Sequence, residues 1–274
     1  MVIVKYRSQL GNQIFQYCFA RILAERIGTI LLARQIGGFK QTGTKFLGAK
    51  ALTCFKNVQI QGHNYRMQAL ASQGSSNHLI LDGYFQRAEY FETVLQTLRD
   101  DWLFQGSLET TSSFDATIHV RGGNWIGGNE KRVHSYYPML PVSYFRSILQ
   151  DHGFRKIAIV TSDKNDPVVV QLQQEFSAKV FSGTAIEDFM TLRRSRNVLL
   201  SVSTFSWWAA FLSFADNIFY PNTGLFNTEE MKKRRDLNWR PDLWPAGDKR
   251  YVKCSVPGPA IWDGTRAQVE ALID

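Results

Sequence analysis

Cysteines, long apolar runs and a secretory signal are scarce or missing in this sequence. Its three cysteines, Cys18, Cys54 and Cys254, lie far apart in 274 residues, so we expect neither a disulfide framework nor a cluster of metal-binding thiolates. Residues 1–6 are too short for a secretory signal, and no apolar core with small residues follows them. The longest apolar stretch, residues 207–215, is far below the ~20 residues that span a bilayer. These absences predict a cytoplasmic protein in a reducing compartment, at most peripheral to the inner membrane.

Two phosphate-binding fingerprints are also missing. No GxxxxGK[ST] segment occurs, which excludes a P-loop NTPase, and no GxGxxG segment occurs, which argues against a standard NAD site. Acidic residues are in deficit, because 24 Asp and Glu stand against 32 Lys and Arg, for a net charge of +8. Such a charge favours an anionic partner, which would be a nucleic acid, a phosphorylated metabolite or an acidic membrane surface, or else it serves only solubility.

The length and composition of the chain predict two folded domains. Hydrophobic residues make up 44% and charged residues 20% of the chain, which suits a globular protein with a sizeable core and excludes disorder as the main state. The length exceeds that of a usual single domain. We place an N-terminal domain at residues 1–112 and a C-terminal domain at residues 113–274. The polar stretch 106–113 (GSLETTSS) is the candidate linker between them.

Both halves alternate predicted strands and helices. Residues 2–6 are typical of a buried strand, residues 14–27 of an amphipathic helix that ends at Gly28, and residues 29–33 of a second strand. In the second half, strands are predicted at 116–120, 156–161, 179–181, 198–202 and 217–220, with helices between them at 142–152, 167–176, 187–195 and 207–215. This alternation indicates parallel sheets, and hence an α/β protein with two Rossmann-like domains that face each other.

Polar residues gather where the predicted strands end. In open α/β sheets, ligands bind beyond the carboxyl ends of the strands. Helix N-termini there present N–H groups that suit phosphate, an arginine adds an anion clamp, and a carboxylate can accept two N–H groups of guanine. We therefore predict a nucleotide-diphosphate site made of Gly11, Asn12, Gln13, His119, Arg121, Asp163, Ser203, Thr204, Phe205 and Ser206.

Each of these residues also has a purely structural interpretation. Gly11 can serve a strand-to-helix turn, and His119 can be a hydrogen-bonded histidine at a strand end. Asp163 can cap the helix near Pro167, while Ser203 and Ser206 can cap the next one. Similarly, the pair at 207–208 (WW) fits a hydrophobic core better than a sugar platform, and the run 232–235 (KKRR) fits a solvated face.

Together these segments resemble one known family. Residues 11–20 (GNQIFQYCFA) resemble the LGNQMFQYAFA opening of the α-1,2-fucosyltransferases, and residues 81–91 (LDGYFQRAEYF) resemble the GYFQSxKYF segment of that family. Residues 118–123 (IHVRGG) resemble its HxRRGDY motif, residues 161–163 (TSD) its FSDD motif, and residues 187–210 its EDLxLM…NSSFSWWGA segment. These matches keep the family order over residues 1–220.

The resemblance implies a fold, a reaction and roles for several residues. It implies a GT-B fold with the donor in the cleft, and inverting, metal-independent transfer of L-fucose from GDP-L-fucose to a sugar hydroxyl. The expected acceptor is a glycan or lipid-linked oligosaccharide, through the 2-OH of galactose, in bacterial surface-polysaccharide synthesis. Arg121 matches the pyrophosphate ligand, His119 and Asp163 match positions that hold guanosine, and residues 203–206 match the turn that holds the β-phosphate. No cofactor, metal or nucleic-acid partner is expected.

Two departures from the family pattern leave alternatives open. The second Arg of the motif is Gly122 here and its Asp is Asn124, which favours a related enzyme with another nucleotide sugar or a non-catalytic binder. Asn124 cannot act as a general base, and Asp115 precedes its strand, so the nearest downstream carboxylate, Glu130, is the candidate base. Otherwise Glu130 is solvated beside Lys131 and Arg132, or the donor phosphate takes the proton.

Overall fold

The computed structural model of the chain describes residues 1–46, 57–74, 78–104, 112–121, 136–233, 235–257 and 262–273. The chain divides into two compact units, one made of Met1–Ser107 and Thr228–Gly247, the other of Leu108–Asn227 and Asp248–Asp274. The second unit therefore contributes the long central part of the chain, and Thr228–Gly247 returns to the first unit. The sequence predicts two consecutive domains and assigns Thr228–Gly247 to the second one. The structure groups this segment with the first unit instead.

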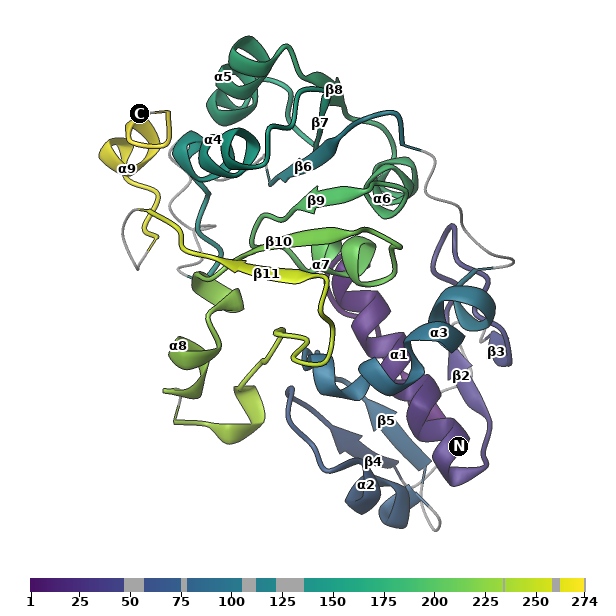
Figure 1. Cartoon of the computed structure of the whole chain (residues 1–274). Helices are drawn as coiled ribbons and strands as arrows, with labels where there is room; N and C mark the ends of the chain where they lie inside the picture. The colour runs from purple at the N-terminus through teal and green to yellow at the C-terminus, as the bar shows by residue number, and fades with distance from the viewer. Residues whose placement is uncertain are drawn as a thin grey trace. The chain divides into compact units, whose positions relative to one another are not determined.

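The first unit is built on a parallel sheet of five strands in the order β3-β2-β1-β5-β4 (Figure 1). Its strands are β1 (Val2–Val4), β2 (Leu31–Ala33), β3 (Thr44–Phe46), β4 (Asn57–Ile60) and β5 (His78–Leu81). Helix α1 (Leu10–Ile27) packs against β1, β2 and the short helix α2 (Met67–Gly74). Further along the chain lie η1 (Ala88–Tyr90), η2 (Glu92–Val94), α3 (Leu95–Thr97) and η3 (Leu98–Trp102).

The first helix shows how the sequence sets an element. Ile14, Cys18 and Ile22 are buried on one side of α1, and Phe15 and Phe19 are fully buried as well. The helix ends where Gly28 adopts the left-handed conformation, with φ 68°, as glycine does at helix C-termini. The predicted end is confirmed, but the helix begins at Leu10 rather than at residue 14.

The second unit holds a parallel sheet of six strands in the order β11-β10-β9-β6-β7-β8 (Figure 1). Its strands are β6 (Ala116–Val120), β7 (Ile157–Thr161), β8 (Lys179–Phe181), β9 (Asn197–Leu199), β10 (Asn217–Pro221) and β11 (Tyr251–Cys254). The helices of this unit are α4 (Val142–Asp151), α5 (Pro167–Phe176), α6 (Ala185–Arg193), α7 (Thr204–Phe211) and α9 (Arg266–Glu270), with the short turn η5 (Gly224–Phe226).

The central strands of this sheet are buried on both faces. Every residue of β6 and β7 is buried, which is why both strands read as nearly continuous apolar runs in the sequence. Trp207 and Trp208 of α7 are fully buried and pack against Phe211. The interpretation of this tryptophan pair as core is therefore confirmed.

The return segment is tied to the first unit by main-chain hydrogen bonds. It contains α8 (Thr228–Lys232) and η6 (Leu237–Trp239). The N–H of Ala88 donates to the carbonyl of Asp242 at 2.7 Å, and the N–H of Asp242 donates to the carbonyl of Gln86 at 2.9 Å. The guanidinium of Arg87 donates to the carbonyl of Arg240 at 3.1 Å.

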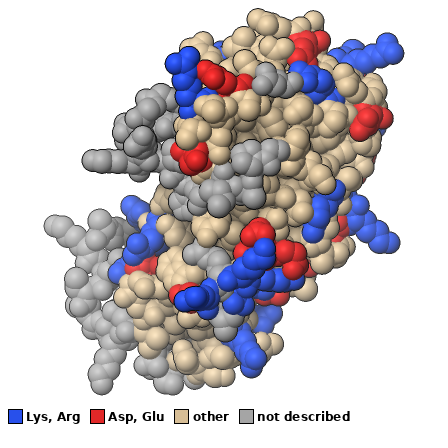
Figure 2. Space-filling model, turned by 90° about the vertical axis from the view of Figure 1, so that its left-hand side faces the viewer, with Lys and Arg blue, Asp and Glu red and all other residues tan. Residues whose placement is uncertain are grey.

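Charged side chains of both signs lie on the face of the molecule shown in Figure 2. On the face shown in Figure 2, Lys and Arg side chains lie among or beside Asp and Glu side chains. Lys232 and Lys233 are exposed and pair with Glu229 and Glu230 at 2.8 and 2.6 Å, as predicted for a solvated face. No helix in the described part of the chain combines the length and the apolar character needed to cross a membrane.

Candidate active site

The second sheet has a topological switch point between β6 and β9. From β6 the chain runs through β7 and β8 on one side, then crosses to β9, β10 and β11 on the other. The strands that follow β6 and β9 therefore lie on opposite sides of this point, an arrangement that in α/β proteins gives a ligand-binding crevice at the carboxyl ends of the two strands. His119 and Arg121 lie at the end of β6, and residues 200–203 follow β9.

Arg121 supplies the positive charge of this crevice. Its Nη1 donates to the carbonyl of Val202 at 3.1 Å, and its guanidinium lies 4.4 Å from the centroid of the Tyr137 ring. Burial lowers the pKa of Arg121, and the group still remains a cation at neutral pH. A cation held in such poorly hydrated surroundings attracts an anion more strongly than one in water.

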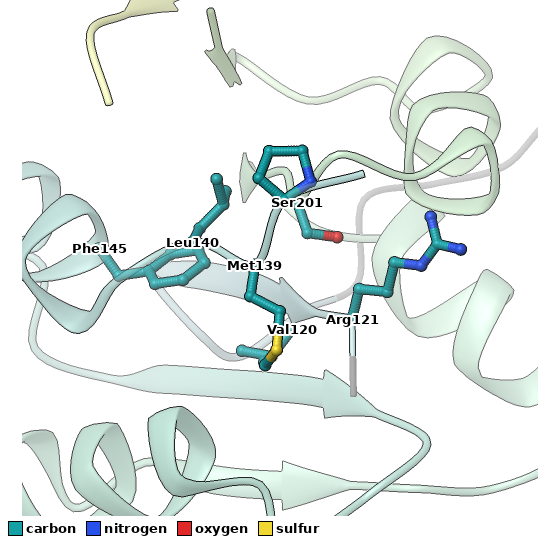
Figure 3. A pocket seen from close by; sticks show the side chains of 7 residues that line it. Val120, Arg121, Met139, Leu140, Phe145 and Ser201 are labelled. Atoms are coloured by element: carbon teal, nitrogen blue, oxygen red, sulfur yellow. The ribbon is translucent and has the colours of Figure 1, made fainter. Parts of the chain in front are cut away.

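A small pocket lies beside Arg121. Figure 3 shows Phe145, Leu140 and Met139 on its apolar side, with the guanidinium of Arg121 and the hydroxyl of Ser201 on its other side. The pocket therefore marks a boundary between the hydrophobic core and a polar edge. Sequence reasoning missed Ser201 and Tyr137, because Ser201 reaches His119 and Tyr137 reaches Arg121 through tertiary contacts that no local pattern encodes.

His119 is a neutral imidazole in this site. The side chain is only 7% exposed, and its Nδ1 lies 2.5 Å from the hydroxyl oxygen of Ser201. Burial, and then the nearby Arg121, lowers the pKa of His119 to about 3. The imidazole therefore adds no charge to the crevice at neutral pH. Its ring packs against that of Phe205, with centroids 5.5 Å apart, which links β6 to the first turn of α7.

The start of α7 closes the other side of the crevice. The helix begins at Thr204, with Ser203 as its N-cap accepting the N–H of Phe205 at 3.3 Å. The prediction of a turn at 203–206 before a helix at 207 is wrong in this respect, since residues 204–206 form the first helical turn. Ser206 is fully buried, and its hydroxyl donates to the carbonyl groups of Ser201 and Ser203. The N-terminal end of α7 therefore carries helix N–H groups and a partial positive charge.

Asp163 lies beyond the carboxyl end of the neighbouring strand, β7. Its side chain is half-buried, and Oδ1 accepts the N–H of Asn165 at 2.9 Å. Asp163 does not cap α5, because the N-cap is Asp166, whose Oδ1 accepts the N–H of Val168. The structural interpretation of Asp163 as that cap is therefore wrong.

The remaining predicted residues lie elsewhere. Gly11, Asn12 and Gln13 belong to the first unit, where they form the first turn of α1 rather than a polar loop. The amide oxygen of Asn12 accepts a hydrogen bond from Gln86 at 2.6 Å, and Gln13 donates to the carbonyl of Ser8 at 2.9 Å. Glu130, Gly122 and Asn124 lie outside the described residues.

One further prediction concerns Asp115, at the amino end of the second sheet. Asp115 precedes β6, and its Oδ2 accepts the N–H groups of Arg155 and Lys156, each at 2.9 Å. It therefore lies at the end of the strand opposite to Arg121, as expected. Within the described residues, no three His, Cys, Asp or Glu side chains come together as a set of metal ligands.

The chain is similar to known glycosyltransferases. The family model described as glycosyl transferase family 11 matches residues 57–244. No curated protein matches the chain. Among solved structures, a mutant of Arabidopsis thaliana FUT1 in complex with GDP has a TM-score of 0.51 and 12% identity, and the match covers 80% of this chain and 70% of that one.

Two other solved structures are similar at lower scores. POFUT1 in complex with GDP-fucose has a TM-score of 0.49 and 8% identity, over 77% of this chain and 92% of that one. The fucosyltransferase NodZ from Bradyrhizobium has a TM-score of 0.47 and 12% identity, over 79% and 94%. At such identities the likeness to FUT1 concerns the fold, and it confirms the predicted GT-B class with two Rossmann-like α/β units.

Proposed function

The chain belongs to glycosyl transferase family 11, and from this premise we propose that it transfers L-fucose from GDP-L-fucose to a hydroxyl group of a glycan. The observation that carries the proposal is the placement of Arg121 and the N-terminus of α7 on the two sides of one switch point. Both groups favour a diphosphate. The similar solved structure of FUT1, which shares the fold, was determined in complex with GDP.

Arg121 is the proposed ligand of the pyrophosphate. Its guanidinium has a planar fork of N–H donors that matches two phosphate oxygens, and one donor is anchored on the carbonyl of Val202. The ring of Tyr137 supports its other face. A group fixed in this way needs little reorganisation when negative charge grows on the leaving phosphate, which is where stabilisation accelerates the reaction.

The first turn of α7 is the proposed site of the β-phosphate. Helix N-termini bind phosphate through N–H groups that have no partner within the helix. Ser203 and Ser206 fix the start of this helix through the hydrogen bonds described above. Thr204 is the first helical residue, and its N–H is the donor that we assign to the phosphate.

The guanine base is assigned to the carboxyl ends of β6 and β7. Asp163 offers a carboxylate oxygen for the N–H groups of guanine. His119, which is neutral, offers a ring nitrogen without adding a second cation beside Arg121. The uncharged guanine is thereby held near the edge of the sheet, while the negatively charged diphosphate of the nucleotide lies at Arg121.

The proposed reaction is a single displacement with inversion. The acceptor oxygen attacks the anomeric carbon of fucose, the bond from that carbon to the phosphate oxygen breaks, and GDP leaves with the electron pair. The hydroxyl proton passes to a general base, for which we propose Glu130, with the leaving phosphate as the alternative. Arg121 and α7 would balance the leaving-group charge without a divalent metal. The acceptor hydroxyl proposed is the 2-OH of galactose in a surface glycan.

A second candidate rests on the sequence around Arg121. Gly122 and Asn124 replace the second Arg and the Asp of the family motif, so a different nucleotide sugar, or binding without turnover, is the alternative. GDP binding combined with turnover of GDP-L-fucose distinguishes the two candidates.

The test combines ligand binding with activity. GDP, UDP and CMP are titrated into the wild type by calorimetry, and release of GDP from GDP-L-fucose is measured with galactose-terminated acceptors. We expect GDP to bind best and Arg121→Ala to weaken its binding by at least about tenfold. Arg146→Ala is the matched control, since Arg146 lies in the same unit but pairs with Glu175 at 2.7 Å. Stronger binding of UDP or CMP, or equal loss in both variants, would contradict the proposal.

A further inference from the structure

Strands β1 and β5 are neighbours in the first sheet, and a charged pair lies beyond their carboxyl ends. Arg7 follows β1, Asp82 follows β5, and the guanidinium of Arg7 forms a two-point ion pair with the carboxylate of Asp82. Asp82 also accepts a hydrogen bond from the amide of Gln59 at 2.6 Å. The Asp82 side chain is 4% exposed, whereas that of Arg7 is 52% exposed, so the pair presents its guanidinium to solvent.

Three aromatic rings form a cluster in the same unit. His63 and Tyr84 are stacked with centroids 5.7 Å apart, and Trp239 lies edge-on to both, at 5.6 and 6.5 Å. Tyr84 is only two residues from Asp82, which joins the cluster to the ion pair through the chain that follows β5. Trp239 is 37% exposed, so the aromatic cluster of His63, Tyr84 and Trp239 has an accessible apolar surface.

The backbone holds these rings in place. The carbonyl of Gly62 accepts the N–H of Tyr84 at 2.8 Å, and the N–H of His63 donates to the carbonyl of Asn238 at 2.5 Å. These approaches need glycine, because a Cβ at Gly62 would lie 2.5 Å from the oxygen of Asn238, and a Cβ at Gly83 would lie 2.6 Å from the oxygen of Gly62. Hydrogen bonds and close backbone contacts thus hold together the loops that follow β4 and β5 and the return segment, at one edge of the first unit.

We propose that this edge binds a neutral pyranose ring of the acceptor glycan, an inference that rests on the proposed function. A pyranose has apolar C–H faces that pack on aromatic rings, and hydroxyl groups that need fixed donors and acceptors. Trp239 and Tyr84 supply the aromatic rings for the C–H faces, and the Arg7–Asp82 pair supplies the fixed donors and acceptors for the hydroxyl groups. Because Asp82 already balances the charge of Arg7, the edge favours a neutral sugar over a phosphate or an acidic sugar.

The chemistry of this edge differs from that of the crevice in the second unit. At Arg121 a half-buried cation lies near a neutral histidine, which suits a diphosphate. At Arg7 the cation is paired with a carboxylate beside aromatic rings. The return segment is essential to the proposal, since it places Trp239 in the first unit although that residue lies far along the chain.

The experiment measures sugar and GDP binding separately. Methyl β-D-galactopyranoside, methyl β-D-glucopyranoside and lactose are the probes, followed by saturation-transfer NMR, with methyl β-D-glucuronide as the acidic comparison and calorimetry for GDP. We expect at least one neutral probe to bind better than the glucuronide. Trp239→Ala is expected to weaken that binding about three- to tenfold, while GDP affinity stays within about twofold.

Matched variants separate sugar binding from a fold defect. Trp239→Phe keeps a ring and is expected to retain part of the binding, and Arg7→Lys keeps the charge but loses the two-point pair, so it is expected to weaken sugar binding with the aromatic cluster intact. Phe214→Ala removes an equally exposed ring in the second unit, 36% exposed, and is expected to change neither ligand.

Two outcomes would overturn the inference. One is a wild type that binds GDP but none of the three neutral probes. The other is a sugar affinity that Trp239→Ala and Arg7→Lys leave unchanged. Failure of the proposed function would give a different result. A wild type that does not bind GDP would contradict the proposed GDP-L-fucose donor, while the sugar measurements would still test this edge.

Discussion

The buried imidazole of His119 links the stability of the protein to pH. In the unfolded chain its pKa returns to about 6.5, whereas in the folded protein burial lowers it to about 3. Between these values the unfolded chain binds the extra proton, so the contribution of His119 to stability is fully present above pH 6.5 and is lost as the pH falls. From pH 7 to pH 5 the free energy of unfolding is expected to fall by about 2 kcal/mol through this residue.

Asp166 acts in the opposite direction and has to be measured with His119. Burial raises the pKa of this N-cap carboxyl of α5 to about 6, above its unfolded value, so the folded state binds a proton more readily. Its contribution is present at low pH and is lost as the pH rises through 6. From pH 7 to pH 5 it adds about 1 kcal/mol to the free energy of unfolding and offsets part of the loss from His119.

Two variants separate these contributions. Relative to the wild type, the destabilisation of His119→Gln is expected to shrink by about 2 kcal/mol from pH 7 to pH 5, since glutamine does not titrate but can still hydrogen-bond Ser201. Asp166→Asn is expected to become less stable relative to the wild type by about 1 kcal/mol over the same interval.

The assay is urea denaturation at pH 7, 6 and 5 without nucleotide, followed by tryptophan fluorescence. A His119→Gln difference that changes by less than about 0.5 kcal/mol, the ordinary scatter of surface substitutions, would refute the assignment of a buried neutral imidazole. A difference that grows towards pH 5 would refute the sign of the argument.

Other predictions concern activity and packing. Arg121→Ala is expected to lower turnover of GDP-L-fucose at a cost of ~2–4 kcal/mol in the transition state while the protein stays folded; near-native kcat/KM would contradict this role. Excess EDTA is expected to leave transfer unchanged, and a strict need for added Mn²⁺ or Mg²⁺ would point to another mechanism. Glu130→Gln is expected to lower kcat by ~10²–10⁴ with unchanged GDP affinity; unchanged kcat would leave the donor phosphate as base. Gly83→Ala is expected to lower the thermal midpoint, because its Cβ would lie 2.6 Å from a backbone oxygen, and an unchanged midpoint would show that this loop moves easily.

Several elements were predictable from the sequence. The predicted bounds of β6, α5 and β8 agree with the structure. Every residue of β6 is buried, as its mainly apolar run indicates, and Pro167 marks the start of α5, whereas β8 agrees although none of its residues is fully buried. Strands β3 and β4 were not predicted, because they have three and four residues and carry little apolar pattern. Strand β11 was missed for a related reason, since Val252 and Lys253 are exposed, and β10 was therefore taken as the final strand.

The candidate site was predictable only in part. His119 and Arg121 follow an obvious strand, so their place at its carboxyl end could be read from the sequence. Their partners could not. Ser201 meets His119 because the chain crosses over and lays β9 beside β6, and Tyr137 comes back to Arg121 from the chain just before α4. Apolar periodicity also placed the start of α7 too late, since it follows the buried tryptophans, whereas the helix begins at the cap formed by Ser203.

The return of Thr228–Gly247 to the first unit bears on how the protein is made. Synthesis on the ribosome runs from the N-terminus, and domains commonly fold as they emerge. Here the carbonyl groups of Asn238 and Asp242, which accept main-chain hydrogen bonds from His63 and Ala88, are synthesised only after most of the second unit. The first unit therefore completes its hydrogen bonding only after most of the second unit has been synthesised, so the order of synthesis and the order of folding differ for this unit.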